Sequence, residues 1–295
     1  MIDVFGDEVK KHRFDECFFA QSQKTPRREK KMNEILQALI LGVVQGLTEL
    51  LPISSSAHLN LIPWVFNWSE ISPSFDVALH FGTLLAIVIF FFKDWIGLIK
   101  GGYNQVVKKE KTPEGKMFWY LVIATIPGGA IGFILDHFLG DALGKMPLLI
   151  ACALIVMGII LYVVDKKAPS KTKYEDMTFK QTFLIGLAQA LAFIPGVSRS
   201  GVTMTTGRLM GVDRESTAKY SFLLSTPIVL GASLYKLKDF VFNIPFVVGV
   251  VASFLTGIFV IKFLLEYLKK GSFKVFAIYR VIIGIAIIGL YISRM

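Results

Sequence analysis

The chain has 295 residues, of which 54% are hydrophobic and only 18% are charged, and its mean hydropathy is +0.58. Soluble globular proteins carry a charge on about a quarter of their residues, so the composition excludes an ordinary soluble domain and predicts an integral membrane protein. The net charge of +10 comes from Lys and Arg residues in the loops and near the start of the chain. That distribution indicates membrane topology and predicts no nucleic-acid partner.

The apolar residues occur in blocks of about 20, the length of a helix that crosses the hydrocarbon core of a bilayer. The strict alternation of a β-barrel is scarce, so we predict an all-α polytopic membrane protein. Residues 1–31 are polar and basic and contain no apolar core of signal-peptide length. We expect them to form a disordered extension that takes no part in the chemistry.

The first apolar run, from residue 35 to 64, is not expected to be one straight helix, because Pro52, Pro63 and three consecutive serines interrupt it. Irregular backbone at membrane depth is tolerated only where protein or a water-filled cavity surrounds it. We therefore predict a re-entrant, broken helix element. Glu49 lies in the same run, and an ionisable residue in such a position indicates a functional site.

Uninterrupted spans follow on both sides of a basic midpoint. They are predicted at about 76–92, 117–138, 146–164, 217–235, 246–268 and 273–293. A basic loop with Lys108, Lys109 and Lys111 separates the first two spans, and a second basic loop covers residues 166–180. Because positively charged loops stay in the cytoplasm, both are expected on that side of the membrane.

A second broken element, from Ile185 to Thr203, repeats the first. A shift of 144 positions superposes four pairs of identical residues, namely Gly42 and Gly186, Gln45 and Gln189, Ser54 and Ser198, and Ser56 and Ser200. Each half, 32–165 and 181–295, then holds one re-entrant element and three spans. An odd number of spans reverses the side on which the second half begins, so we predict an inverted repeat.

A phosphoryl group requires cations and amide donors around its oxygens, a nucleophile in line with the leaving oxygen, and a base for the proton. Arg199 offers planar, bidentate donors suited to phosphate. The turn at Pro195 and Gly196 leads into a helix start, whose free amides favour an anion. The alternative for Arg199 is a structural ion pair with a buried carboxylate such as Glu49.

Glu49 and His58 flank the serines and are the candidate proton carriers, because a serine hydroxyl is a weak nucleophile without a base within reach. A purely structural role stays open for both residues. For Ser54 and Ser56, a role as helix caps explains the sequence as well as a catalytic one.

Gln45 lies one helical turn before Glu49 and faces the same way. It could orient the carboxylate or, together with it, hold Mg²⁺ or Ca²⁺, although a neutral side chain weakens the metal interpretation. His80 and Arg280 are further ionisable residues in or beside spans. Arg280 could reach the site or extend to the cytoplasmic rim.

Two long motifs, G-V-V-Q-G-L-T-E-L-L-P-I-S-S-S-A-H and P-G-V-S-R-S-G-V-T, are followed by F-L-L-S-T-P and F-A-I-Y-R. From about Met32 onward the chain thereby resembles the bacterial undecaprenyl-diphosphate phosphatases, also called bacitracin-resistance proteins. The resemblance implies a multi-pass hydrolase of the bacterial plasma membrane that removes the terminal phosphate of undecaprenyl diphosphate. Such an enzyme recycles the lipid carrier of peptidoglycan synthesis, and its fold has paired re-entrant elements.

By position, the resemblance places the acidic motif on Gln45 and Glu49, the nucleophile on Ser55, the motif histidine on His58 and the phosphate-binding arginine on Arg199. The residues expected to contact the substrate around them are Gln45, Ser54, Ser56, Ser198, Ser200, Gly201 and Thr203. Gln45 and Glu49 are also the candidate ligands of the divalent cation.

The resulting hypothesis is that Ser55 attacks the terminal phosphorus, with Glu49 assisting directly or through His58. Arg199 and the loop amides hold the developing charge, and the polyprenyl tail lies among membrane lipids. A homodimer stays open as the assembly. The rival interpretation is a transporter or flippase for an anionic polyprenyl phospholipid, because inverted repeats with broken helices are also transporter architecture.

Overall fold

The computed structural model describes residues 27–68, 72–139 and 146–294, and for residues 27–32, 133, 136, 137 and 139 it describes the backbone alone. Of the predicted N-terminal extension, residues 1–26 lie outside the described part. The α-helices are α2 (Arg27–Thr48), α3 (Ser55–Phe66), α4 (Pro73–Phe90), α5 (Phe92–Val107), α6 (Pro113–Leu139), α7 (Pro147–Lys167), α8 (Phe179–Ala188), α9 (Arg199–Leu209), α10 (Arg214–Lys236), α11 (Ile244–Leu268) and α12 (Lys274–Ser293). Short 3-10 helices are η2 (Tyr174–Asp176), η3 (Gln189–Phe193) and η4 (Leu237–Asp239). The described residues form no strand.

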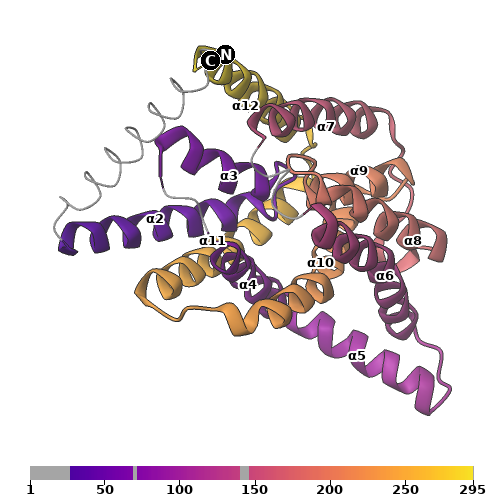
Figure 1. Cartoon of the computed structure of the whole chain (residues 1–295). Coiled ribbons are helices and arrows are strands. Elements are labelled where there is room, and N and C mark those ends of the chain that lie inside the picture. The colour runs from indigo at the N-terminus through magenta and orange to yellow at the C-terminus, as the bar shows by residue number, and fades with distance from the viewer. Residues whose placement is uncertain (1–26, 69–71, 140–145, 295) are drawn as a thin grey trace.

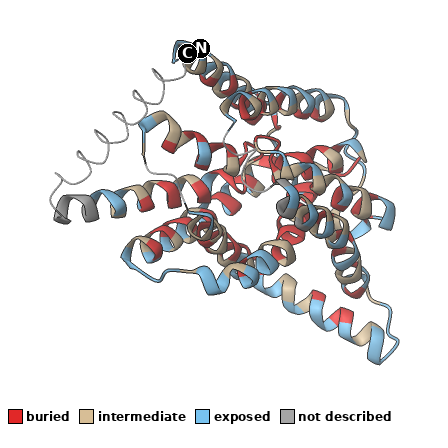
Figure 2. Cartoon of the chain, viewed as in Figure 1, coloured by how far each residue is buried: buried red, intermediate tan, exposed pale blue. Residues whose placement is uncertain are grey.

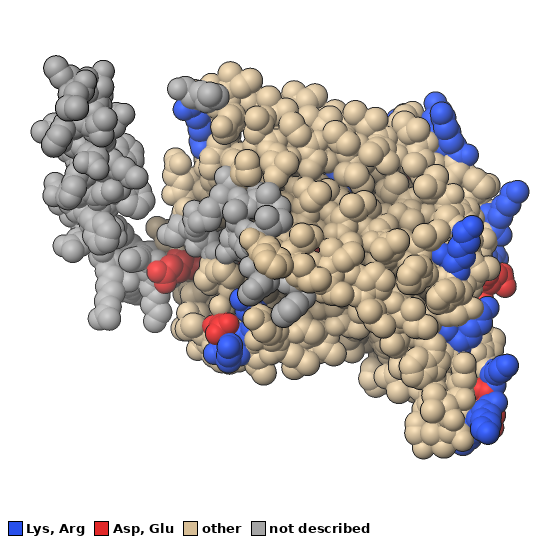
Figure 3. Space-filling model, turned by 45° about the vertical axis from the view of Figure 1, so that its right-hand side comes forward, with Lys and Arg blue, Asp and Glu red and all other residues tan. Residues whose placement is uncertain are grey.

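Among the described helices, α4, α7, α11 and α12 are long and apolar enough to cross a membrane. They expose large apolar side chains that water would not favour, for example Phe259 on α11 and Ile285 on α12. On the face drawn in Figure 3, the lysines and arginines gather toward the ends of the molecule and leave a broad uncharged band between them. The chain is therefore an all-helical membrane protein.

All six predicted spans coincide with helices, namely α4, α6, α7, α10, α11 and α12. The expectation that only a basic loop separates the first two of them is wrong, because residues 92–107 form α5. The exposed apolar residues of α5 recur every three or four positions, at Phe92, Ile96, Ile99 and Tyr103. This is the pattern of an amphipathic helix, which a search for continuous apolar blocks passes over. In Figure 1, α5 projects away from the other helices at the lower right.

Helices from the two halves of the chain pack on one another. α2 lies along α11, α8 lies along α6, and α7 pairs with α12 (Figure 1). The main core includes α10, on which Tyr220, Phe222 and Leu224 have no exposed surface. Figure 2 shows buried residues concentrated toward the middle of the molecule, where α2 ends and α3 and α9 begin. Packing between the halves therefore brings the two broken elements together.

A buried ionic cluster joins the ends of α7, α9, α10 and α12. Asp165 accepts hydrogen bonds from Arg208 Nε at 2.9 Å and from Arg214 Nε at 2.7 Å. Its second carboxylate oxygen accepts from the main-chain amide of Phe273 at 3.0 Å. Asp165 is 4% exposed and Arg208 is 1% exposed, so these charges compensate one another away from water.

We expect Asp165→Asn to destabilise the protein by about 3–5 kcal/mol, because it leaves two arginines without their shared countercharge. If the single side-chain oxygen of the asparagine faced the arginines, its NH₂ group would face the Phe273 main-chain N–H, which would then lose its acceptor. Thermal unfolding in detergent, compared between wild type and variant, measures the effect. An unchanged midpoint would show that the cluster contributes nothing to stability.

Candidate active site

The first broken element is a sharp interruption between α2 and α3. α2 ends at Thr48, and Pro52, which has no amide hydrogen to donate, lies in the turn that follows. Ser54 adopts a left-handed backbone conformation, with φ of 77°, and its hydroxyl accepts from the Ala57 amide at 3.3 Å. Ser54 is thus the N-cap of α3, and Ser55 occupies the first helical position.

The second broken element has the same local geometry. After α8 and η3, Gly196 turns the chain with φ of 93°. Ser198 then adopts φ of 74°, and its hydroxyl accepts from the Gly201 amide at 3.1 Å, so it is the N-cap of α9. Arg199 occupies the first helical position, the one that Ser55 occupies in α3. The two breaks therefore present a hydroxyl and a guanidinium at equivalent positions.

Glu49 is the meeting point of the two elements and is only 7% exposed. Its Oε2 accepts a hydrogen bond of 2.5 Å from the Ser55 hydroxyl, and its Oε1 accepts one of 2.9 Å from Arg199 Nη2. Gln45 Nε2 also donates to Oε2, at 3.3 Å. The structure therefore brings together the carboxylate, hydroxyl and guanidinium predicted to share a site.

Arg199 is held from α10 as well as by Glu49. Its Nη1 donates to the main-chain oxygen of Ser221 at 2.9 Å. The hydroxyl of Ser221 lies 2.7 Å from that of Thr203, which in turn donates to the Arg199 carbonyl at 2.8 Å. Ser221 was not predicted, although it opens the segment S-F-L-L-S-T-P that contains one of the shorter motifs. These contacts fix the direction of the guanidinium.

The histidine that contacts Glu49 is His80 on α4, which was not among the predicted site residues. Its Nε2 lies 3.3 Å from Glu49 Oε2, and its Nδ1 lies 2.9 Å from the main-chain oxygen of Asp76. Both partners are acceptors, an arrangement that favours hydrogen on both ring nitrogens and a positively charged imidazole. The sequence feature that could have identified His80 as a site residue was its position inside an apolar span. Glu49 thus lies between two positive charges.

His58 faces α12. Its Nδ1 lies 2.7 Å from the main-chain oxygen of Ser54, and its Nε2 lies 2.7 Å from the Tyr279 hydroxyl. The two rings are also stacked, with centroids 5.7 Å apart. Tyr279 was not predicted, but it belongs to the F-A-I-Y-R motif. His58 therefore supports the Ser54 turn. Of the two expected routes between Glu49 and Ser55, direct or through His58, the structure contains the direct contact.

The remaining predicted residues line the junction of the two breaks. Hydroxyl pairs 3.3 Å apart join Ser54 to Ser56 and Ser198 to Ser200. Ser200 also donates across the junction to the Leu51 carbonyl at 3.0 Å. Ser54 and Ser198 are thus helix caps, and Ser200 connects the two elements.

Gln45 provides the feature that bears on a bound cation. It is fully buried, and its Oε1 has no hydrogen-bond partner. A free amide oxygen one turn from a carboxylate suits Mg²⁺ or Ca²⁺, which take oxygen ligands and often share them with substrate phosphates. In the described part of the chain, no three His, Cys, Asp or Glu side chains gather as a metal site. Gln45 and Glu49 fit a cation that the substrate helps to bind.

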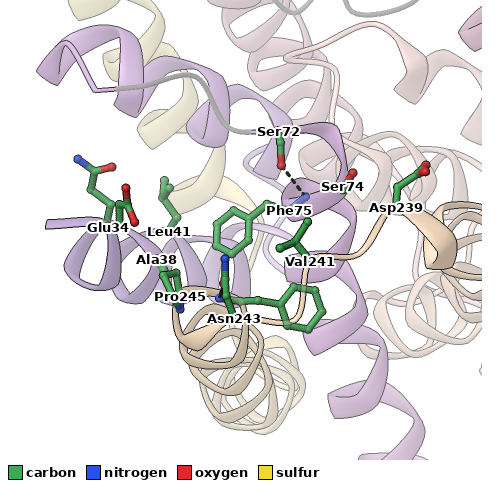
Figure 4. Close-up of a pocket in the computed structure, with 12 residues that line it drawn as sticks. Glu34, Ala38, Leu41, Ser72, Ser74, Phe75, Asp239, Val241, Asn243 and Pro245 are labelled. Carbon is green, nitrogen blue, oxygen red and sulfur yellow. Dashed lines mark hydrogen bonds between the residues drawn. The ribbon is translucent and has the colours of Figure 1, made fainter. Parts of the chain in front are cut away.

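A separate cavity lies at the N-terminal ends of α2, α4 and α11 (Figure 4). Its volume is about 420 Å³, and its lining includes Glu34, Ala38, Phe75 and Asn243. None of the predicted site residues lines it. The arrangement around Glu49 is therefore the candidate site, and the cavity is a different feature of the molecule.

The fold and this arrangement define a helical membrane protein with a charged, hydroxyl-rich site built from two broken helices. The family model described as bacitracin resistance protein BacA matches residues 38–286, which is most of the chain. The chain belongs to this family.

This chain covers nearly the whole length of several curated relatives. A protein named undecaprenyl-diphosphatase from Pelotomaculum thermopropionicum is 50% identical over 263 residues, which are 88% of this chain and 98% of the relative. Proteins of the same name from Desulforudis audaxviator and Caldicellulosiruptor bescii are each 45% identical, with the same two coverages.

Proposed function

We propose that this chain is a multi-pass phosphatase of the bacterial plasma membrane that hydrolyses undecaprenyl diphosphate to undecaprenyl phosphate and inorganic phosphate. The names of the relatives and their near-complete coverage support this activity. The product is the lipid carrier of peptidoglycan synthesis, so the reaction recycles the carrier. The description of the family names resistance to bacitracin, which we include in the proposed function.

One observation carries the chemical proposal. The Ser55 hydroxyl donates to one oxygen of Glu49 at 2.5 Å, while the other oxygen pairs with Arg199 at 2.9 Å. A hydroxyl this close to a carboxylate has a base in place to accept its proton. The same carboxylate holds the guanidinium next to the hydroxyl. Nucleophile, base and phosphate ligand therefore lie together before substrate arrives.

In the first step, Ser55 Oγ forms a bond to the terminal phosphorus, and the bond from this phosphorus to the bridging oxygen breaks. Undecaprenyl phosphate leaves, and Glu49 takes the Ser55 proton and passes it to the leaving phosphate. In the second step, water attacks the phosphoserine and the bond from phosphorus to Oγ breaks. Glu49 takes a proton from this water and returns it to Ser55 Oγ, which restores the enzyme.

Arg199 exchanges partners during this reaction. In the free protein its Nη2 holds Glu49, and on binding it turns to the terminal phosphate, while Nη1 stays on the Ser221 carbonyl. The main-chain amides at the starts of α3 and α9 add donors for the anion. His80 keeps a positive charge beside Glu49, so the carboxylate stays compensated when Arg199 leaves. His58 and Tyr279 support the Ser54 turn from the other side.

A divalent cation fits this proposal. Gln45 Oε1 and Glu49 would hold it together with the diphosphate oxygens. Such a cation neutralises diphosphate charge and polarises the phosphorus–oxygen bond that breaks.

The inverted repeat is part of the same proposal. Both Gly42 and Gly186 lie at close helix crossings, where an added Cβ would overlap a main-chain oxygen of Gly249 in α11 or of Ala124 in α6. Each broken element thus packs against a span of the opposite half. Ser54 and Ser198 also share an unusual backbone conformation. These equivalent features support two re-entrant elements in halves of opposite orientation, 32–165 and 181–295.

The test is phosphate release from undecaprenyl diphosphate by the purified protein in detergent, with and without EDTA. We expect release that EDTA reduces and that Mg²⁺ or Ca²⁺ restores. Movement of the lipid across vesicles without phosphate release would overturn the enzyme and support a transporter or flippase. The mass of the protein in the same detergent tests whether it forms a homodimer.

A further inference from the structure

Arg280 on α12 is a buried arginine that the reaction above does not use. It has no exposed surface. Within the described part of the chain, its guanidinium donates to main-chain oxygens of Leu154 at 3.2 Å, Pro52 at 3.1 Å, Gly196 at 2.7 Å and Val197 at 3.0 Å. A buried charge is costly unless such hydrogen bonds satisfy it.

These acceptors belong to three separate segments. Pro52 lies in the first broken element, three residues from both Glu49 and Ser55. Gly196 and Val197 lie in the second broken element, two or three residues before Arg199. Where a helix is interrupted, main-chain oxygens lose their helical donors and need other partners. One guanidinium supplies those donors to both elements at once and ties them to α7.

The chain leaves space for this side chain. An added Cβ on Gly201, in the first turn of α9, would lie 2.7 Å from Arg280 Nη1, and one on Gly158 would lie 3.0 Å from Arg280 Cβ. The end of an arginine side chain can usually move away, but hydrogen bonds to separate segments hold this one. Gly201, predicted to contact substrate, is thus where α9 makes room for Arg280.

We propose that Arg280 is a positioning residue, which holds the broken element carrying Glu49 and Ser55 in register with the one carrying Arg199. It acts through main-chain oxygens and does not touch substrate. Lysine cannot replace it, because an ammonium group is a point donor and cannot span acceptors on different segments as a planar guanidinium does. The inference rests on the proposed function only for its activity readout.

The first test measures main-chain hydrogen exchange by mass spectrometry in detergent, without substrate. Arg280→Met should accelerate exchange in peptides that cover residues 49–58 and 194–202. The matched control is Arg294→Met, since Arg294 follows the same helix and donates to the Trp64 and Val65 carbonyls at 2.9 Å. That variant should accelerate exchange only near the end of α3. Unchanged exchange at both breaks in Arg280→Met would overturn the inference.

The second test separates positioning from substrate binding. Because a displacement of about 1 Å costs on the order of 10²-fold in rate, Arg280→Met should lower kcat by about that factor and leave KM within about threefold. Arg280→Lys should lower kcat by about tenfold, since lysine keeps the positive charge but lacks the planar set of donors of the guanidinium. Arg294→Met should keep wild-type kcat. A loss confined to KM would instead place Arg280 in substrate binding and overturn the positioning role.

Gly201→Ala covers the case in which Arg280→Met does not fold. Its new methyl group displaces the guanidinium without removing it, so faster exchange at both breaks and a lower kcat are expected. Wild-type values for both measurements would overturn the inference. If the wild-type protein released no phosphate but the exchange results held, the proposed function would fail and the positioning role would stand.

Discussion

Replacing Ser55 with alanine is expected to lower kcat for phosphate release by at least about 10³-fold, with KM within about threefold of wild type. The hydroxyl donates to Glu49 at 2.5 Å, so its loss removes the nucleophile and leaves the base without a proton to accept. The substitution does not change Arg199 or its contact with the Ser221 carbonyl, so the guanidinium can still turn to the phosphate and the variant should still bind diphosphate. Steady-state kinetics with purified protein in detergent give both constants.

Ser225→Ala is the matched control for this result. Ser225 is buried, and its hydroxyl donates to the Phe222 carbonyl within its own helix, at 2.6 Å. Its kcat should stay within about twofold of wild type. Rapid quenching followed by mass spectrometry should detect a phosphoryl group on Ser55 in the wild-type protein. If Ser55→Ala retained wild-type kcat, water would be the direct nucleophile and the covalent step would be wrong.

Glu49→Gln should lower kcat by about 10²- to 10⁴-fold, the usual contribution of a general base. The amide keeps the size of the side chain but cannot accept a proton from Ser55. It also leaves the cationic His80 and Arg199 without their shared countercharge, and the stability of the protein should fall as well. Activity must therefore be measured per folded molecule, as judged by thermal unfolding in the same detergent.

Asp165→Asn separates the two effects of Glu49→Gln. Asp165 is likewise a buried carboxylate paired with two cations, but its partners are Arg208 and Arg214, whereas Ser55 contacts Glu49. It should lose stability by a similar amount and keep wild-type kcat in the folded fraction. If the two variants lost the same fraction of kcat, the effect of Glu49→Gln would be attributable to stability, and its role as a base would be contradicted.

The two histidines show where prediction from local sequence stops. His58 lies close to the serines in sequence, which left a route from Glu49 through His58 open beside the direct one, and in the structure it faces Tyr279 on α12. His80 lies 31 positions beyond Glu49 in an apolar span, and α4 places it in contact with the carboxylate. Sequence distance along a broken helix does not determine the direction in which a side chain points. That direction depends on how the helices pack.

The sequence by itself determined the class of protein, helices at the six predicted spans and the positions of both breaks, because apolar blocks, prolines and serine caps act through local and solvent energetics. It also made Glu49 and Arg199 site candidates by residue type, and the family resemblance added Ser55. Only the tertiary structure decided that these residues meet, that His80 joins them and that Arg280 holds both breaks. Those contacts join segments that lie far apart along the chain, such as Glu49 and Arg199 or Arg280 and Pro52, and packing between the helices sets their geometry.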